Sequence, residues 1–147
     1  MAAMFDQLFL GTILTVLTFT AAALLIWVFE AILRQRRPWL LRPPHGLKLM
    51  LLLCLTLFWM MAMLTVAVWI WAVAFRLLGI FGTLEASVYF SLVAFTTLGF
   101  GDVLLPQEWR LLSGLSAANG LLMFGLMTAV LVETLRETRG MQREGPS

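Results

Sequence analysis

Hydrophobic residues are gathered into three long runs, and the segments between them carry most of the polar positions. The runs extend from about Leu8 to Leu33, from Leu49 to Leu78, and from Leu111 to Leu135. A helix rises about 1.5 Å per residue and the hydrocarbon core of a bilayer is roughly 30 Å thick, so about 20 apolar residues suffice to cross it. Each run therefore predicts a transmembrane helix.

A fourth apolar segment, from Thr83 to Phe95, is too short to cross a bilayer as a helix. A segment of this length is typical of a re-entrant or buried helix. Thr83 is suited to cap its N-terminus, and Glu85 in the first turn favours the positive end of the helix dipole. The sequence therefore predicts a short helix that enters the membrane without spanning it, followed by the heptad 96–102.

Composition supports a membrane protein with a single domain. Of the 147 residues, 61% are hydrophobic and 12% are charged, and the mean hydropathy is +0.94. An ordinary soluble domain is about half apolar and about a quarter charged. The single Cys54 excludes an intrachain disulfide. Because the sequence shows no metal-ligand cluster, nucleophile arrangement or phosphate-binding loop, we expect neither an enzyme nor a nucleic-acid partner.

Basic residues are distributed unevenly, and this sets the expected orientation. Two of the ten, Arg76 and Arg110, lie near the short apolar segment; the others follow the first and third runs. The positive-inside rule then predicts a cytoplasmic C-terminus, an external N-terminus and an external turn at the heptad. The N-terminus lacks the basic region of a signal peptide, so the first run is expected to be retained. We expect a bacterial inner membrane. The eight residues expected on the cytoplasmic side are Arg34, Arg36, Arg37, Arg42, Lys48, Arg136, Arg139 and Arg143.

Two segments are expected to lie outside the helices. Residues 34–48 contain Pro38, Pro43 and Pro44, which oppose a continuous helix, and predict a basic cytoplasmic linker. One interpretation is that the positive charge of the linker only sets the membrane topology. The other is that the linker also binds anionic lipid. Residues 136–147 are expected to form a short cytoplasmic tail, without regular structure from Gly140 onward.

The heptad 96–102 is the segment whose residues suggest a chemical function, the coordination of a cation by backbone carbonyls. Irregular backbone is tolerated at membrane depth only where protein buries it or water meets it. Gly99 and Gly101 reach dihedral angles that other residues avoid, and their alternation lets successive carbonyls point to one side. Four such strands around an axis would replace the hydration shell of a cation with rings of oxygens. One strand offers too few oxygens, so one motif per chain predicts a homotetramer in the lipid bilayer.

Residues 91–102 resemble the pore helix and signature sequence of the potassium channel family, whose usual form is T-T-V-G-Y-G-D. Here Leu98 and Phe100 replace the valine and tyrosine. Residues 109–112 and 119–129 resemble the start and middle of the family's inner helix. The resemblance covers about residues 49–135 and implies a K⁺-selective channel.

The resemblance also implies a complete architecture. We expect an all-α membrane protein with three transmembrane helices, a re-entrant pore helix and a filter loop, assembled with fourfold symmetry. The pore domain, 49–135, would follow an N-terminal transmembrane helix, 1–33, and the linker, 34–48. Within the pore domain the expected segments are the outer helix 49–78, pore helix 83–95, filter 96–102 and inner helix 110–135; the tail 136–147 follows.

Individual roles follow from the same resemblance. K⁺, the one expected cofactor, would bind the carbonyls of Thr97, Leu98, Gly99 and Phe100 and the Thr97 hydroxyl, with Gly101 completing the filter. Glu133 would either ring the cytoplasmic mouth or pair with an arginine. Gly120 falls at the family's hinge glycine, and close helix packing explains it equally well. Asn119 is expected to face the bundle interior, where an interhelical hydrogen bond is favoured over contact with the ion. Filter support is assigned to Thr96, Asp102, Tyr89 and Phe90, and the cavity or gate to Phe124 and Thr128.

Two alternatives stay open at this stage. Phe100 lacks the hydroxyl that the usual tyrosine supplies, and Tyr89 and Phe90 stand where many members carry two tryptophans. A less selective cation channel is therefore one alternative. A non-conducting pore-like membrane subunit that assembles with another channel is the other, and an additional regulatory subunit is left open. No arginine series lies within a span, so no voltage sensor of the usual kind is expected.

Overall fold

The computed structural model describes residues 2–40 and 45–143, and in these ranges it consists of helices and loops without a strand. The predicted all-α fold is confirmed. The elements are α1 (Ala2–Leu40), α2 (His45–Leu77), α3 (Leu84–Phe95), the short 3-10 helix η1 (Gln107–Trp109) and α4 (Arg110–Arg143).

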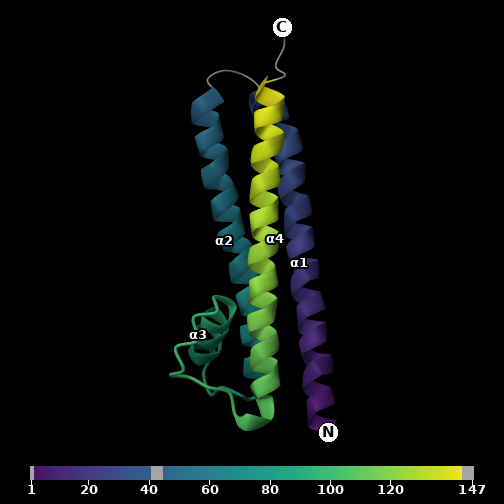
Figure 1. Ribbon diagram of the computed structural model, residues 1–147, viewed down its shortest axis with the longest axis vertical. Helices are drawn as coiled ribbons and strands as arrows, with labels where there is room; N and C mark the ends of the chain where they lie inside the picture. Colours follow the sequence, from purple (N-terminus) through teal and green to yellow (C-terminus); the bar gives the residue numbers. More distant parts are fainter. Residues whose placement is uncertain (1, 41–44, 144–147) are drawn as a thin grey trace.

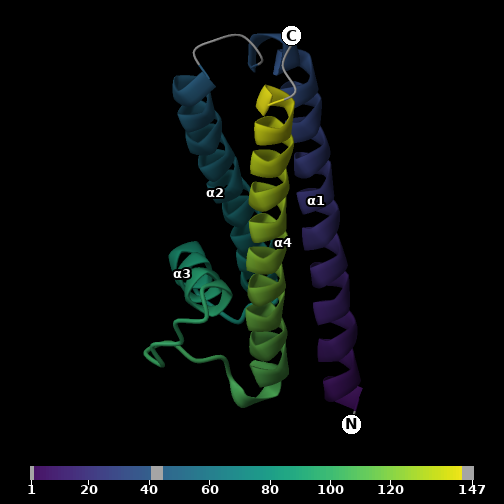
Figure 2. The same ribbon diagram turned by 45° about the horizontal axis from the view of Figure 1, so that its top comes forward.

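Three long helices run side by side along the molecule, and the short α3 packs beside one end of them (Figures 1 and 2). Stretches of α1, α2 and α4, the last with η1, are long and apolar enough to cross a membrane: Met4–Arg36, Gly46–Leu77 and Gln107–Gly140. The start of α1 and all of α3 lie at one end, called the filter end here. The end of α1, the start of α2 and the end of α4 lie at the other, called the linker end (Figure 1). The chain is an integral membrane protein.

All three long helices extend beyond the predicted bounds. The predicted linker 34–48 is wrong in most of its length, because α1 continues to Leu40 and α2 begins at His45. Pro38 lies in the last turn of α1, where it removes one helical hydrogen bond without ending the helix before Leu40. Pro43 and Pro44 lie outside the described residues.

The predicted tail is wrong for residues 136–143, which continue α4 to Arg143. Six of its eight residues are good helix formers: three arginines, one glutamate, one methionine and one glutamine. Gly140 alone costs only about 1 kcal/mol in a helix interior. The four residues after Arg143 lie outside the described ranges.

Helix α1 docks on the pore domain through one narrow face. Gln7, Gly11, Leu14 and Thr18 are buried at spacings of four, three and four residues, which keeps them on one side of the helix. A Cβ atom at Gly11 would lie 2.3 Å from Cδ1 of Leu115, so the missing side chain permits close contact between α1 and α4.

A polar contact completes this docking. The Leu112 N–H in the first turn of α4 donates to Oε1 of Gln7 at 3.3 Å. N–H groups in the first turn of a helix have no partner within the helix itself. Gln7 therefore caps α4 from another helix, 105 residues away along the chain.

An aromatic cluster joins α2 to α3. Phe75 lies at its centre, with ring centroids 5.4 Å from Phe90, 5.8 Å from Trp71 and 6.1 Å from Phe81. Trp71 also meets Phe95 at 6.3 Å. Edge-to-face aromatic pairs add about 0.5–1.5 kcal/mol each beyond their burial. This aromatic cluster therefore holds α3 against α2.

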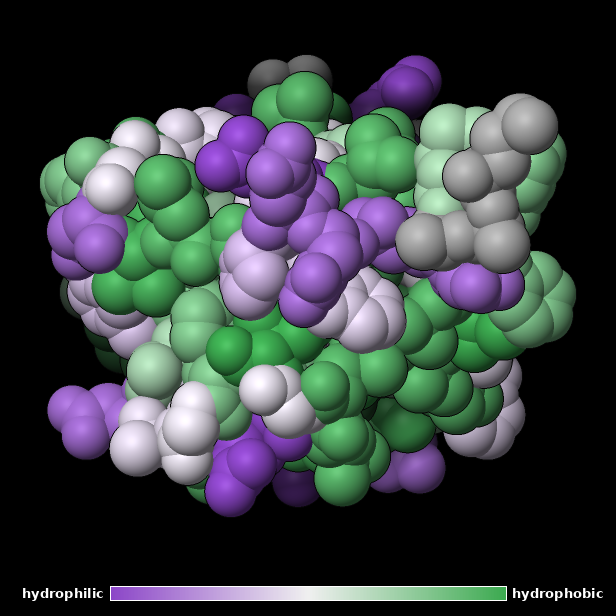
Figure 3. Space-filling model, turned by 90° about the horizontal axis from the view of Figure 1, so that it is seen from below, coloured by the Kyte–Doolittle hydropathy of each residue, from purple (hydrophilic) through white to green (hydrophobic). Residues whose placement is uncertain are grey.

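The remaining surface is strongly apolar. Large side chains such as Phe9, Trp27 and Phe58 are exposed along α1 and α2. Seen from the filter end, hydrophilic groups gather toward the middle and at a few edges, while hydrophobic residues cover much of the rest (Figure 3). Such a surface suits a lipid environment rather than water.

Candidate functional site

Helix α3 begins where the sequence predicts it. Thr83 has extended backbone (φ −127°, ψ 152°), and its hydroxyl accepts a hydrogen bond from the Ala86 N–H at 3.2 Å. Glu85 lies in the first turn, where the helix dipole favours a negative charge. Its N-terminus is therefore fixed by residues immediately around the cap.

The other end of α3 passes directly into the heptad. The Leu98 N–H donates to the Val93 carbonyl at 3.2 Å, and the Thr97 N–H to the Ala94 carbonyl at 3.0 Å. This pair of bonds is the Schellman motif, whose turning residue has a left-handed conformation and is usually glycine. Here it is Thr97, with a φ of +56°. A β-branched residue in this conformation costs about 1–2 kcal/mol, so the start of the heptad is strained.

The sign of the backbone dihedral angle φ alternates along the heptad. Thr97, Gly99 and Gly101 have φ values of +56°, +55° and +79°, whereas Leu98 and Phe100 are not in the positive region. An ordinary strand points successive peptide groups to opposite sides, but alternation of left- and right-handed conformations lines up successive N–H groups on one side. An ion path lined by carbonyls needs them aligned on one side, and positive φ at every second residue is a pattern that allows this alignment.

A hydrogen bond ties the outer part of this strand back to α3. The Tyr89 hydroxyl donates to Oδ2 of Asp102 at 2.6 Å. This bond is the main reason that the pKa of Asp102 lies below its ordinary value; backbone hydrogen bonds act in the same direction and desolvation against it. The sequence assigned both residues to filter support without predicting their contact. The one feature of the sequence that could have drawn attention to this contact is that Tyr89 is the only tyrosine in the chain.

Removal of this bond has a testable consequence for pH. Because the Asp102 pKa is lowered, the ionised pair stabilises the loop above the ordinary carboxylate range, and this stabilisation is lost as pH falls through the lowered value. In a Tyr89→Phe protein the Asp102 pKa is expected to rise. Infrared titration of the carboxylate band, with Asp102→Asn to assign it, measures the shift. An unchanged titration midpoint in Tyr89→Phe would contradict this role of the hydroxyl.

The other predicted support residues act elsewhere. The Thr96 hydroxyl donates to the Leu92 carbonyl at 2.8 Å, at the C-terminal end of α3. Phe90 is buried and packs on Phe75 and Phe81 of the aromatic cluster, 5.4 and 5.3 Å away. Phe90 therefore supports α3 against α2, while Tyr89, its neighbour in the chain, contacts Asp102.

Gly120 is the point where α4 meets the end of the pore helix. A Cβ atom there would lie 2.4 Å from the Phe95 carbonyl oxygen and 2.5 Å from its Cα atom. Close packing against backbone therefore explains this glycine. Asn119 beside it is buried as expected, at 1% exposure. Within the described ranges of one chain, neither side-chain polar atom of Asn119 has a hydrogen-bond partner. The predicted interhelical hydrogen bond is therefore not formed inside the chain, and it stays a prediction for a helix of another copy.

The residues assigned to the cavity or gate do not all share one face of α4. Phe124 and Thr128 are exposed neighbours, and the Thr128 hydroxyl donates to the Phe124 carbonyl at 2.9 Å. At about 100° per residue, Glu133 lies about 180° around the helix from Phe124. It lines a crevice of about 630 Å³ between α1 and α4, together with Glu30 and others. Glu133 therefore cannot face the same space as Phe124.

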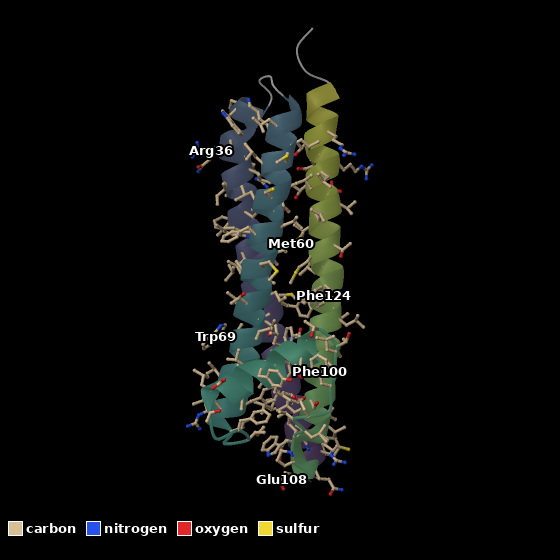
Figure 4. All side chains as sticks on the ribbon, turned by 90° about the vertical axis from the view of Figure 1, so that its left-hand side faces the viewer. Arg36, Met60, Trp69, Phe100, Glu108 and Phe124 are labelled. Carbon is tan, nitrogen blue, oxygen red and sulfur yellow. The ribbon has the colours of Figure 1, made fainter. Side chains whose placement is uncertain are left out.

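The heptad is uncovered in a single chain. The side chains of Leu98 and Phe100 are 59% and 66% exposed. Phe100 and Phe124 lie at successive levels along the bundle, with Phe124 nearer the linker end (Figure 4). The exposed positions Leu121, Phe124 and Thr128 recur at helical spacing along α4. One chain thus offers one carbonyl strand and two uncovered apolar surfaces beside it.

Comparison with known protein families gives one match. The family model described as "Ion channel" (Ion_trans_2) matches residues 51–137, which is more than half of the 147-residue chain. The matched range contains nearly all of α2, all of α3, the heptad and most of α4. Neither the curated proteins nor the solved structures give a match. With this match and a pore-loop geometry between two membrane-length helices, the chain belongs to this ion channel family.

Proposed function

We propose that four copies of this chain form a K⁺-selective channel whose filter is the backbone of residues 97–101. The observation that carries this proposal is the alternation of φ along the heptad, with positive values at Thr97, Gly99 and Gly101. Carbonyl rings built from such strands replace the hydration shell of K⁺, and Na⁺ is disfavoured. Carbonyls of Thr97, Leu98, Gly99 and Phe100 would hold the ions, and the Thr97 hydroxyl would add the innermost ring.

The exposed surfaces of the single chain support a homotetramer. The apolar side chains of Leu98 and Phe100 are exposed in the single chain. They belong to a segment of irregular backbone, whose N–H and C=O groups cannot face lipid. Packing against the neighbouring subunits' pore helices would cover them. The Leu121, Phe124 and Thr128 face of α4 would then line the cavity on the linker side of the filter.

Orientation follows from the charges at the two ends. Arg34, Arg36 and Lys48 lie at the linker end together with the basic end of α4. The positive-inside rule places this end in the cytoplasm, and the filter end and N-terminus outside. The proposed setting is a bacterial inner membrane, where K⁺ would move passively down its gradient.

The test is ion flux through purified protein in liposomes, measured for K⁺ and Na⁺ under matched gradients, with subunit number determined by chemical cross-linking in detergent. We expect a cross-linked tetramer and K⁺ flux at least about tenfold above Na⁺ flux, which corresponds to about 1.4 kcal/mol of selectivity. Equal fluxes would replace this proposal with a non-selective cation channel. A persistent monomer without flux would identify a non-conducting pore-like subunit.

A further inference from the structure

A groove of about 430 Å³ lies between α1 and α2 at the linker end. Its walls are apolar: Ile32 and Leu33 come from α1, and Leu51, Leu52 and Leu55 from α2. Arg36 and Trp39 line it nearer the end of α1. The candidate spans have Arg36 of α1 and Gly46 of α2 at their linker ends, so the groove lies toward the linker end of these two apolar stretches.

The end of this groove is held in place by an internal contact. The Lys48 ammonium donates to the Trp39 backbone carbonyl and lies 4.6 Å from the centroid of the Trp39 ring. Lys48 is itself buried, at 7% exposure. The contact joins the last turn of α1 to the first turn of α2, and so fixes Trp39 beside the apolar walls. A tryptophan at this depth is typical of the headgroup region.

Charge distinguishes this groove from the crevice between α1 and α4. The described residues that line the groove include one basic residue, Arg36, and none that is acidic. Arg36 points away from the bundle near the linker end (Figure 4), and it forms no ion pair within the described ranges. The crevice instead carries Glu30, Glu133 and Glu137, and its one arginine, Arg34, is paired with Glu30 at 3.1 Å. An anionic group is therefore attracted to the groove and repelled from the crevice.

We propose that the groove binds an anionic phospholipid of the leaflet at the linker end. One acyl chain lies between Leu33 of α1 and Leu51 and Leu55 of α2, and the phosphate pairs with the Arg36 guanidinium. A guanidinium offers a planar pair of donors that matches phosphate oxygens. The ligand thus bridges the N-terminal helix and the outer helix, and this role does not depend on which ion the channel conducts.

The test is native mass spectrometry of the full-length protein, released from detergent after exchange into equal mixtures of phosphatidylglycerol and phosphatidylcholine. We expect preferential retention of phosphatidylglycerol, reduced about fivefold in Arg36→Gln, since one basic residue at an anionic surface contributes roughly this factor. Arg34→Gln is the matched control, because it removes the same charge two residues away but from a side chain that lines the crevice. Its retention should equal that of the unaltered protein.

Two further arms separate the lipid from other sources of phosphate. Leu55→Trp fills the apolar part of the groove without altering charge, and is expected to lower phosphatidylglycerol retention while circular dichroism stays unchanged. Glycerol phosphate, the soluble headgroup analogue, should not displace the bound lipid. Equal loss in Arg34→Gln and Arg36→Gln, equal retention of the two lipids, or displacement by glycerol phosphate would each overturn the proposal.

Discussion

Replacement of Gly99 by alanine is expected to reduce K⁺ flux at least about 100-fold while the protein stays folded and tetrameric. Gly99 has a φ of +55°, and nothing lies within 4 Å of a Cβ atom built there, so the effect is conformational and not steric crowding. A left-handed conformation costs an L-residue about 1–2 kcal/mol. In the proposed tetramer four subunits would share the filter, so the total of roughly 4–8 kcal/mol exceeds the 2.8 kcal/mol that corresponds to 100-fold. Flux in liposomes measures the loss.

Gly114→Ala is the matched control for this experiment. Gly114 lies within α4 without a positive φ, and a Cβ atom there would meet nothing within 4 Å. Alanine in a helix interior is favoured over glycine by up to about 1 kcal/mol. Flux through Gly114→Ala should therefore stay close to that of the unaltered protein. If Gly99→Ala conducted as well as this control, the heptad backbone would not be the ion path.

Replacement of Gly120 by alanine is expected to lower the free energy of unfolding by about 1–3 kcal/mol per chain, the usual cost of an extra methyl group in a packed interior. The new Cβ atom would lie 2.4–2.8 Å from three backbone atoms of Phe95, and backbone cannot rotate away as a side chain can. The end of α3, and with it Thr97, must shift. Thermal unfolding in detergent, followed by circular dichroism, measures the change.

The same variant separates packing from a hinge. If Gly120 acted as a hinge, alanine would alter the fraction of time that the channel is open and leave stability close to that of Gly114→Ala. If it acts as the packing site for Phe95, Gly120→Ala unfolds at a lower temperature than Gly114→Ala. Unchanged stability together with altered flux would contradict the packing interpretation.

Much of this architecture was accessible from the sequence because the signals are local. The spans follow from apolar length, and the start of α3 follows from Thr83 and Glu85 within a single turn. The family match over residues 51–137 agrees with the resemblance of residues 49–135 to a channel pore. The prediction failed at Pro38, which was read as a helix breaker although α1 continues past it to Leu40.

What the sequence did not reveal are the partners in contacts between segments distant in the chain. The bond from Leu112 to Gln7, the burial of Phe90 among Phe75 and Phe81, and the meeting of Gly120 with Phe95 all depend on how helices pack. Periodicity within one helix says which residues share a face, but not which neighbour that face meets. For this reason the sequence left two roles open for Glu133, the mouth of the pore or a pair with an arginine, and did not show that it lines the crevice between α1 and α4.

The docking of α1 constrains how the inner helix can move. At the filter end, α4 is pinned by the Gln7 hydrogen bond and by the contact of Gly11 with Leu115. At the linker end, the two helices are separated by the crevice of about 630 Å³. Because α1 and α4 are in closest contact at the filter end, we expect any displacement of α4 relative to α1 to be largest at the linker end. The N-terminal helix then holds α4 in place at the filter end. A chain shortened past Gln7 would lose the hydrogen bond that fixes this end of α4.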